Sequence, residues 1–248
     1  MNDFLSALQF LTVVPFAAKS AAGKKMANSL IFFPLAGLLI GIVLAGLGAL
    51  LSVLHFYELT AAIILVVALA AITGGLHLDG LSDTLDGLMC GKDRDKCLEV
   101  MRDPHSGAMG VIGIVCVFLL KIGLIFSLSP RARPDALILM CVLSRWSMVE
   151  TMFLFPYARS EGKAKVFIEH ISGRQFRWAT AIAAAIAVLA WQVKGLLIFA
   201  AAGSFAWLFS KMVSRKLGGI TGDTLGAQCE LTEVAALFFI ILTDTFIV

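Results

Sequence analysis

The chain has 248 residues, of which 59% are hydrophobic and 15% are charged, and its mean hydropathy is +0.92. So few polar residues cannot coat a soluble globule, which excludes that class and makes a lipid bilayer the expected solvent. The formal net charge of +3 is too small to indicate a nucleic-acid partner, so none is expected. Because a bilayer offers no water to unpaired backbone groups, the apolar segments should be helices.

The first apolar stretch runs from Asn2 to Val14 and stops at Pro15, which suits a helix lying in the membrane interface. It lacks the basic start and the small-residue cleavage site of a removable signal peptide, so none is expected. Further apolar segments are long enough to cross about 30 Å of hydrocarbon as helices. They lie at residues 30–52, 59–76, 107–129, 135–156, 178–193, 195–213 and 227–247.

The fifth and sixth of these segments are closely joined. Residues 178–213 are therefore expected to form either a tight helical hairpin that turns at Lys194–Gly195 or a re-entrant pair. No internal repeat or low-complexity linker divides the chain. The sequence predicts an all-α fold, a polytopic integral membrane helical bundle of about seven transmembrane helices plus an N-terminal interfacial helix, in a single membrane-embedded domain over residues 1–248.

Lysine and arginine are unevenly distributed between the two sides of the predicted bundle. Of the 20 such residues, Arg131, Arg133 and Lys194 fall on one side, Lys121 and Arg145 fall inside segments, and all the others fall on the opposite side. Short loops rich in Lys and Arg stay in the cytoplasm, so the sequence predicts a multi-pass protein of the inner (cytoplasmic) membrane. The parts expected to face the cytoplasm are the N-terminus and the loops 77–106, 157–177 and 214–226.

The first cytoplasmic loop contains an acidic motif, in which Asp79, Asp83 and Asp86 are spaced four and then three residues apart. On a helix these carboxylates lie within about 60° of one another and repel unless a cation or protons neutralise them. Oxygen ligands alone favour Mg²⁺, which usually completes its shell with water and substrate phosphates. Gly80 and Gly87 are expected to leave one flank open to a bulky phosphorylated ligand. The simpler alternative is a solvated helix end at the membrane surface.

Two other segments bring polar groups to the same predicted surface. Asp103 lies between Arg102 and the Pro104–His105 pair just before a span, and Asp103–Pro104 could equally be a helix-start signal. Further along the chain, Asp223 lies in a Gly-rich turn whose N–H groups could bind phosphate. Both segments are candidates to complete a site around the acidic motif.

Ionisable residues inside predicted spans are costly, at about 2.5–3.5 kcal/mol for an Arg, Lys or Asp at mid-bilayer. Lys121, Arg145 and Glu150 are in this position and are therefore expected to face a polar cavity. Lys121 and Arg145 could hold substrate phosphates or pair with Glu150, and both alternatives stay open. Glu230 and Glu233 follow the Gly-rich turn at helical spacing.

Several other chemistries lack their sequence signals. The four histidines have no zinc-site spacing and no Cys-x-x-Cys motif occurs. There is also no Ser-His-Asp order, Walker lysine motif or dinucleotide fingerprint. The residues by themselves therefore predict a Mg²⁺-assisted transfer of a phosphate-linked group.

Six segments in order carry a family resemblance: FPLAGLLIG at 33–41, HLDGLSDTLDG at 77–87, LEVMRDPHSGAMG at 98–110, SR at 144–145, VFIEHISGRQ at 166–175 and TGDTLGAQCELTE at 221–233. Over nearly its full length the chain resembles the cobalamin synthase family, also called adenosylcobinamide-GDP ribazoletransferases. The resemblance implies that Mg²⁺ is required and that adenosylcobinamide phosphate passes from adenosylcobinamide-GDP to α-ribazole or α-ribazole 5′-phosphate, with release of GMP. Membrane lipid, a second copy of the chain and other corrinoid-assembly enzymes are further expected partners.

Carried onto this sequence, the resemblance implies roles for three groups of residues. The metal ligands would be Asp79, Asp83 and Asp86, with Asp103 and Asp223 as further candidates. The basic residues that bind the diphosphate would be Arg102, Lys121 and Arg145. The hydroxyl proton would pass to His77 or to an aspartate, with Asp83 the one we favour, unless a metal ion alone activates the hydroxyl.

The chain departs from the family pattern at two places. Family members often have Asp-Ser-Arg where this chain has Asp-Pro-His at 103–105, and Leu-Thr-Arg where it has Leu-Thr-Val at 11–13. A substrate role that the family gives to those arginines therefore does not carry over.

Two other functions are weighed against this one. A CDP-alcohol or prenyl-type Mg²⁺-dependent membrane transferase would also use aspartates in membrane helices, but the CDP-alcohol pattern needs Ala-Arg after Asp-Gly, and here Leu81 and Ser82 follow Asp79–Gly80. A cation-coupled transporter would use ionisable residues in spans, such as Glu150 and Asp244. The clustering of the main acids at one surface, away from the midplane, counts against the transporter.

Overall fold

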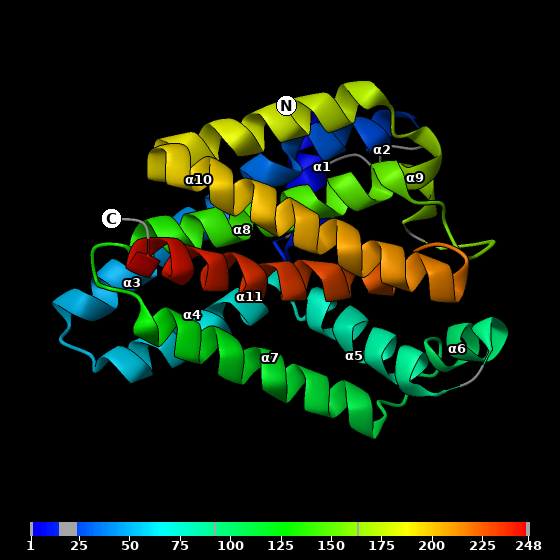
Figure 1. Ribbon diagram of the computed structural model, residues 1–248, viewed down its shortest axis with the longest axis horizontal. Coiled ribbons are helices and arrows are strands. Elements are labelled where there is room, and N and C mark those ends of the chain that lie inside the picture. Colours follow the sequence, from blue (N-terminus) through cyan, green and yellow to red (C-terminus); the bar gives the residue numbers. More distant parts are fainter. Residues whose placement is uncertain (1, 15–23, 92, 163, 247–248) are drawn as a thin grey trace.

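The structure, a computed structural model, describes residues 2–14, 24–91, 93–162 and 164–246. Within these residues the regular elements are helices, and the long ones lie side by side in one bundle (Figure 1). They are α1 (Asn2–Leu11), α2 (Lys24–Asn28), the 3₁₀ turn η1 (Ser29–Phe32), α3 (Phe33–Val53), α4 (Glu58–Thr73), α5 (Leu76–Met89), α6 (Arg94–Val100), α7 (Ala108–Ser127), α8 (Arg133–Leu154), α9 (Lys165–His170), α10 (Gly173–Leu217) and α11 (Gly222–Phe246).

Five helices of the described chain are long and apolar enough to cross a membrane: α3 with the turn before it, α7, α8, α10 and α11. A sixth candidate is the pair α4 and α5, which passes the same test together but is sharply bent between the two helices. Each apolar segment predicted from the sequence lies in one of these helices. The predicted polytopic helical membrane bundle is therefore confirmed.

Helix α8 is at the centre of the bundle, where it packs against α3, α10 and α11. All of its residues from 139 to 149 are buried. Two glycines of α3 allow the closest of these contacts, because a Cβ added to Gly37 would lie 2.3 Å from the carbonyl oxygen of Cys141, and one added to Gly41 would lie 2.5 Å from Cα of Ile138. Small residues permit such backbone contact between membrane helices, where dispersion contacts hold the pair together.

The acidic motif lies on helix α5 and not in a loop. Helix α4 ends at two glycines in the left-handed region, Gly74 (φ +62°) and Gly75 (φ +69°), which favour glycine because a Cβ is strained there. The chain then bends by 91° and continues as α5. The prediction of a loop over residues 77–106 was therefore wrong for its first half, while the helical spacing assumed for the aspartates is confirmed. Helix α5 packs between α7 and α11.

Helix α10 is a hairpin of two helices rather than one straight rod. Trp191 and Gln192 have non-helical dihedral angles, and a Cβ on Gly195 would lie only 1.9 Å from the carbonyl oxygen of Ala187. Figure 1 shows the chain running out and returning at this point. The hairpin was predicted, but its turn lies three residues before Lys194–Gly195, because Gly195 provides the close crossing and not the turn.

The N-terminal helix is confirmed as α1, which ends at Leu11 and packs its Ala7 and Leu8 into the bundle. Its end is tied to the end of α4, since the N–H of Val13 donates to the carbonyl oxygen of Ile72 at 2.9 Å. The predicted stop at Pro15 lies outside the described residues.

The basic loops are gathered at one end of the bundle. Figure 1 places α6, α9 and the connection from α10 to α11 together at one end, and the α3–α4 and α7–α8 connections at the other. The sequence had predicted that the segments around these three elements share one side of the membrane.

Candidate functional site

Helices α5 and α11 touch through their backbones. A Cβ on Gly80 of α5 would lie 2.7 Å from the carbonyl oxygen of Asp223, and one on Gly226 of α11 would lie 3.1 Å from the carbonyl oxygen of His77. This contact brings the start of α11 against the acidic motif of α5. Asp223, predicted from a separate segment of the sequence, therefore belongs to the same site as the motif.

The glycines of the motif serve helix packing. We expected Gly80 and Gly87 to leave one flank open to a ligand, and this expectation was wrong. Gly80 is in contact with α11, and a Cβ on Gly87 would lie 2.3 Å from Cγ of Met101, beside α6. A ligand must therefore approach the aspartates from another side.

Asp79, Asp83 and Asp223 form what we call the acidic cluster. Asp83 is partly buried, and the charged side chains around it are those of Asp79, Asp223, Arg159 and Asp86. Asp79 is exposed. Among the described residues, no three Asp, Glu, His or Cys side chains are already arranged as a metal site. The cluster supplies hard oxygen donors and a surplus of negative charge, which fits the chemistry of Mg²⁺.

Arg159 is the basic partner of this cluster. Its Nη1 lies 2.8 Å from a carboxylate oxygen of Asp223, and its side chain is 11% exposed. Its Nε and Nη2 have no hydrogen-bond partner among the described residues. In the sequence, Arg159 is one of many basic loop residues, and its position shortly after the predicted span 135–156 was the only signal that could have singled it out.

Asp86 differs from the other aspartates of the motif because both of its oxygens accept hydrogen bonds. The N–H groups of Gly107 and Gly110 donate to Asp86 at 2.7 Å and 2.9 Å. These donors belong to the start of α7, so Asp86 caps a helix that begins 22 residues later in the chain. Its predicted role as a metal ligand stays a prediction.

Asp103 lies in the exposed loop before α7. Its carboxylate accepts the N–H of His105 at 2.9 Å and contacts the ring Nδ1 of His105 at 2.7 Å, and these contacts lower the pKa of the Asp103 carboxyl. Because α7 begins at Ala108 with Gly107 as its N-cap, the helix start suggested by Asp103–Pro104 was wrong. Arg102 is also exposed, and the metal and substrate roles of Asp103 and Arg102 stay predictions.

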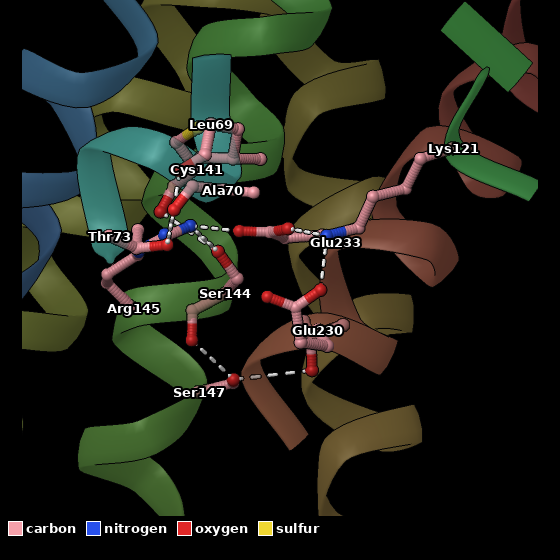
Figure 2. Close-up of polar contacts among 11 residues, drawn as sticks. Leu69, Ala70, Thr73, Lys121, Cys141, Ser144, Arg145, Ser147, Glu230 and Glu233 are labelled. Atoms are coloured by element: carbon pink, nitrogen blue, oxygen red, sulfur yellow. Dashed lines mark hydrogen bonds and ion pairs between the residues drawn. The ribbon is translucent and has the colours of Figure 1, made fainter. Parts of the chain in front are cut away.

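Lys121, Arg145, Glu230 and Glu233 form what we call the interior ion network. Figure 2 shows the ammonium group of Lys121 between Glu230 and Glu233, and the carboxylate of Glu233 between Lys121 and Arg145. The Lys121–Glu230 distance is 2.6 Å, and none of the four side chains is more than 4% exposed. The pairing with Glu150 that the sequence left open was wrong, and the substrate-binding role of Lys121 and Arg145 stays a prediction.

His77 lies against this network rather than at the open side of the acidic cluster. It is 1% exposed, and neither ring nitrogen has a hydrogen-bond partner in the described part of the chain. The charges acting on it belong to Arg145, Glu233 and Lys121. Its predicted role as a proton acceptor remains untested by the geometry.

Comparison with known proteins agrees with the resemblance. The sequence profile of a family described as cobalamin-5-phosphate synthase matches residues 3–241. Relatives named adenosylcobinamide-GDP ribazoletransferase include one from Desulforamulus reducens, 36% identical over 95% of this chain and 94% of its own, and one from Pseudomonas paraeruginosa, 38% identical over 96% of both chains. A third, from Roseiflexus sp., is 38% identical over 93% of this chain and 86% of its own. No solved structure matches the chain. The chain belongs to the cobalamin-5-phosphate synthase family.

Proposed function

We propose that the protein is an adenosylcobinamide-GDP ribazoletransferase that acts at the final stage of cobalamin biosynthesis. A ribose hydroxyl of α-ribazole, or of α-ribazole 5′-phosphate, forms a bond to the phosphorus that carries adenosylcobinamide. The bond from that phosphorus to the bridging oxygen breaks, GMP leaves with the bonding electrons, and the hydroxyl proton passes to a base. The product is adenosylcobalamin or its 5′-phosphate.

The observation that best supports this proposal is the acidic cluster with Arg159 beside it, in a chain of this family. Three carboxylates with one guanidinium leave an excess of negative charge, which suits a divalent cation that brings phosphate oxygens with it. The interior ion network, in contrast, has as many bases as acids and is closed to solvent. Substrate chemistry is therefore proposed at the acidic cluster.

The cofactor we propose is Mg²⁺, held by Asp79, Asp83 and Asp223. These donors come from two helices whose backbones touch at Gly80. When bound, Mg²⁺ would clamp the diphosphate oxygens and stabilise the charge that develops on the leaving GMP. Asp86 already accepts two backbone N–H groups, so we do not include it among the direct ligands.

The protein's own groups supply positioning and proton transfer. Asp83 is a better candidate than His77 for the hydroxyl proton, because Asp83 lies in the acidic cluster while His77 is buried against the interior ion network. Asp86 holds the start of α7 against α5 and so fixes the side of the site opposite α11. These contacts keep the reacting groups oriented.

We propose that the end of the bundle carrying α6 and α9 faces the cytoplasm and that the membrane is the inner membrane. Most of the loop lysines and arginines gather at that end, where positive-inside bias and anionic lipid headgroups favour them. Water-soluble α-ribazole and GDP-activated corrinoid would then reach the acidic cluster from the cytoplasm.

The direct test is turnover by the purified protein in detergent with adenosylcobinamide-GDP, α-ribazole and Mg²⁺. We expect equal amounts of GMP and of a corrinoid joined to ribazole, both lost when EDTA removes divalent cations. A folded preparation that forms neither product would contradict the proposal. CDP-activated lipid substrates in a parallel reaction test the alternative transferase, and ion flux across sealed vesicles tests the transporter.

A further inference from the structure

Arg159 and Asp223 are held next to each other by the backbone segments that precede them. The N–H of Ala158 donates to the carbonyl oxygen of Ile220 at 2.8 Å, and the N–H of Ile220 donates to the carbonyl oxygen of Pro156 at 2.8 Å. These bonds form a short parallel bridge between the loop after α8 and the loop before α11. The side chains that follow the bridge on each segment therefore start from fixed positions.

A second arginine fastens this bridge from α6. Nε of Arg94 donates to the carbonyl oxygen of Leu217 at 2.7 Å, and its Nη2 donates to the carbonyl oxygen of Ala158 at 2.9 Å. Gly219 allows the close contact, since a Cβ there would lie 2.5 Å from the carbonyl oxygen of Pro156. The guanidinium donors of Arg94 therefore hold the two loops together. The guanidinium donors of Arg159 are used differently.

The guanidinium of Arg159 uses only part of its donor capacity. Nη1 is paired with Asp223, while the buried Nε and Nη2 contact no acceptor in the described residues. A guanidinium presents its N–H groups as a planar fork that matches two oxygens of a phosphate. Since buried donors in proteins are normally hydrogen-bonded, these two are suited to a ligand. Their place beside the acidic cluster indicates an anion that also binds a divalent cation.

We propose that Arg159 is a substrate-binding residue that grips the diphosphate of the GDP-activated substrate through Nε and Nη2 while Nη1 keeps its contact with Asp223. This inference rests on the proposed function and adds a residue that sequence analysis gave no role. It also explains why an arginine lies among the proposed cation ligands: the guanidinium gives a phosphate group an attractive partner among carboxylates that would repel it.

The experiment measures binding of inorganic pyrophosphate in the presence of Mg²⁺, by calorimetry on the detergent-purified full chain, for the wild type, Arg159→Gln and Arg159→Lys. Loss of a charged two-point contact should weaken binding by Arg159→Gln by about tenfold or more, with Arg159→Lys in between. In turnover, Arg159→Gln should raise KM for adenosylcobinamide-GDP and leave KM for α-ribazole near the wild-type value. The control is Arg174→Gln, an exposed arginine at the start of α10, which should bind pyrophosphate as the wild type does.

Wild-type pyrophosphate affinity in folded Arg159→Gln, or no binding by the wild type, would overturn the inference. If Arg159→Gln does not fold, as judged by its thermal unfolding, Arg159→Lys decides, because it keeps the positive charge near Asp223 and loses the fork; unchanged affinity there overturns the inference as well. Pyrophosphate binding that depends on Arg159 in a protein that makes no corrinoid product would support the anion site and reject the proposed function.

Discussion

The acidic cluster and the interior ion network use the same kinds of side chain in opposite ways. Both draw on α11, which carries Asp223 at its start and Glu230 and Glu233 about two to three turns further along. In the interior network each carboxylate contacts a base and is closed to solvent. In the acidic cluster, Asp79 and Asp83 add negative charge beyond that of Asp223, with which the guanidinium of Arg159 is paired.

This difference teaches that the charged groups around an acidic or basic side chain, and not its residue type, decide whether it stabilises the helix packing or is suited to bind a ligand. Buried charges are tolerated where they neutralise each other, and such a network fixes which helices pack together. Charges of one sign gathered at an accessible place repel one another and favour a ligand of the opposite sign. On this basis the network joins α7, α8 and α11, whereas we propose that the acidic cluster binds a divalent cation.

The largest effect should follow from breaking the interior network with Glu233→Ala. Removing this carboxylate leaves Arg145 without its acid and Lys121 with only Glu230. Loss of one partner from a buried ion pair costs about 3–5 kcal/mol, so the free energy of unfolding in detergent should fall by that amount. The exposed Glu99→Ala is the matched control. Equal stability of the two variants would contradict the structural role of the network.

A smaller loss should follow from separating the helices that form the acidic cluster. In Gly80→Ala the added Cβ would lie 2.7 Å from the carbonyl oxygen of Asp223, so α5 and α11 must move apart. Overpacking of this kind costs about 1–3 kcal/mol, measured as thermal stability, and turnover should fall further than stability explains. Gly46→Ala adds a methyl where no atom lies within 4 Å and should do neither. Wild-type turnover in Gly80→Ala would mean that the α5–α11 contact does not set the site.

The smallest of the three effects concerns Asp86, the one motif aspartate whose oxygens are already satisfied. Asp86→Ala should cost about 0.5–2 kcal/mol of stability, because the first N–H groups of α7 lose their cap. Its Mg²⁺ requirement in turnover should stay near that of the wild type. A higher Mg²⁺ concentration for half-maximal turnover in Asp86→Ala, with unchanged stability, would contradict the capping role and place Asp86 among the cation ligands of the acidic cluster.

Much of the fold followed from the sequence because bilayer thickness sets the length of an apolar helix. The segments, the α10 hairpin and the gathering of basic loops at one end were all predicted. The loop expected over residues 77–106 was wrong for its first half, although the spacing of the aspartates already indicated a helix there. The sequence did not show the bend at Gly74 and Gly75 or the packing of α5 between α7 and α11.

The site was predicted in its residue types but not in its pairings. Local spacing placed Asp79, Asp83 and Asp86 on one face of a helix, yet it could not tell that Asp86 caps a helix whose donors lie 21 and 24 residues later. The partner of Lys121 at Glu230 is 109 residues away in sequence, so no periodicity connects them. Such contacts depend on tertiary packing, which a single sequence does not record.

The most direct test of the account is Asp83→Asn, assayed for turnover over a range of Mg²⁺ concentrations. The substitution keeps the size of the side chain and removes its charge, so the fold should survive. We expect turnover at a fixed Mg²⁺ concentration to fall by about 100-fold or more and the Mg²⁺ concentration for half-maximal turnover to rise, because a ligand is lost from the acidic cluster. Wild-type turnover with an unchanged Mg²⁺ requirement would contradict the claim that these carboxylates bind the cation.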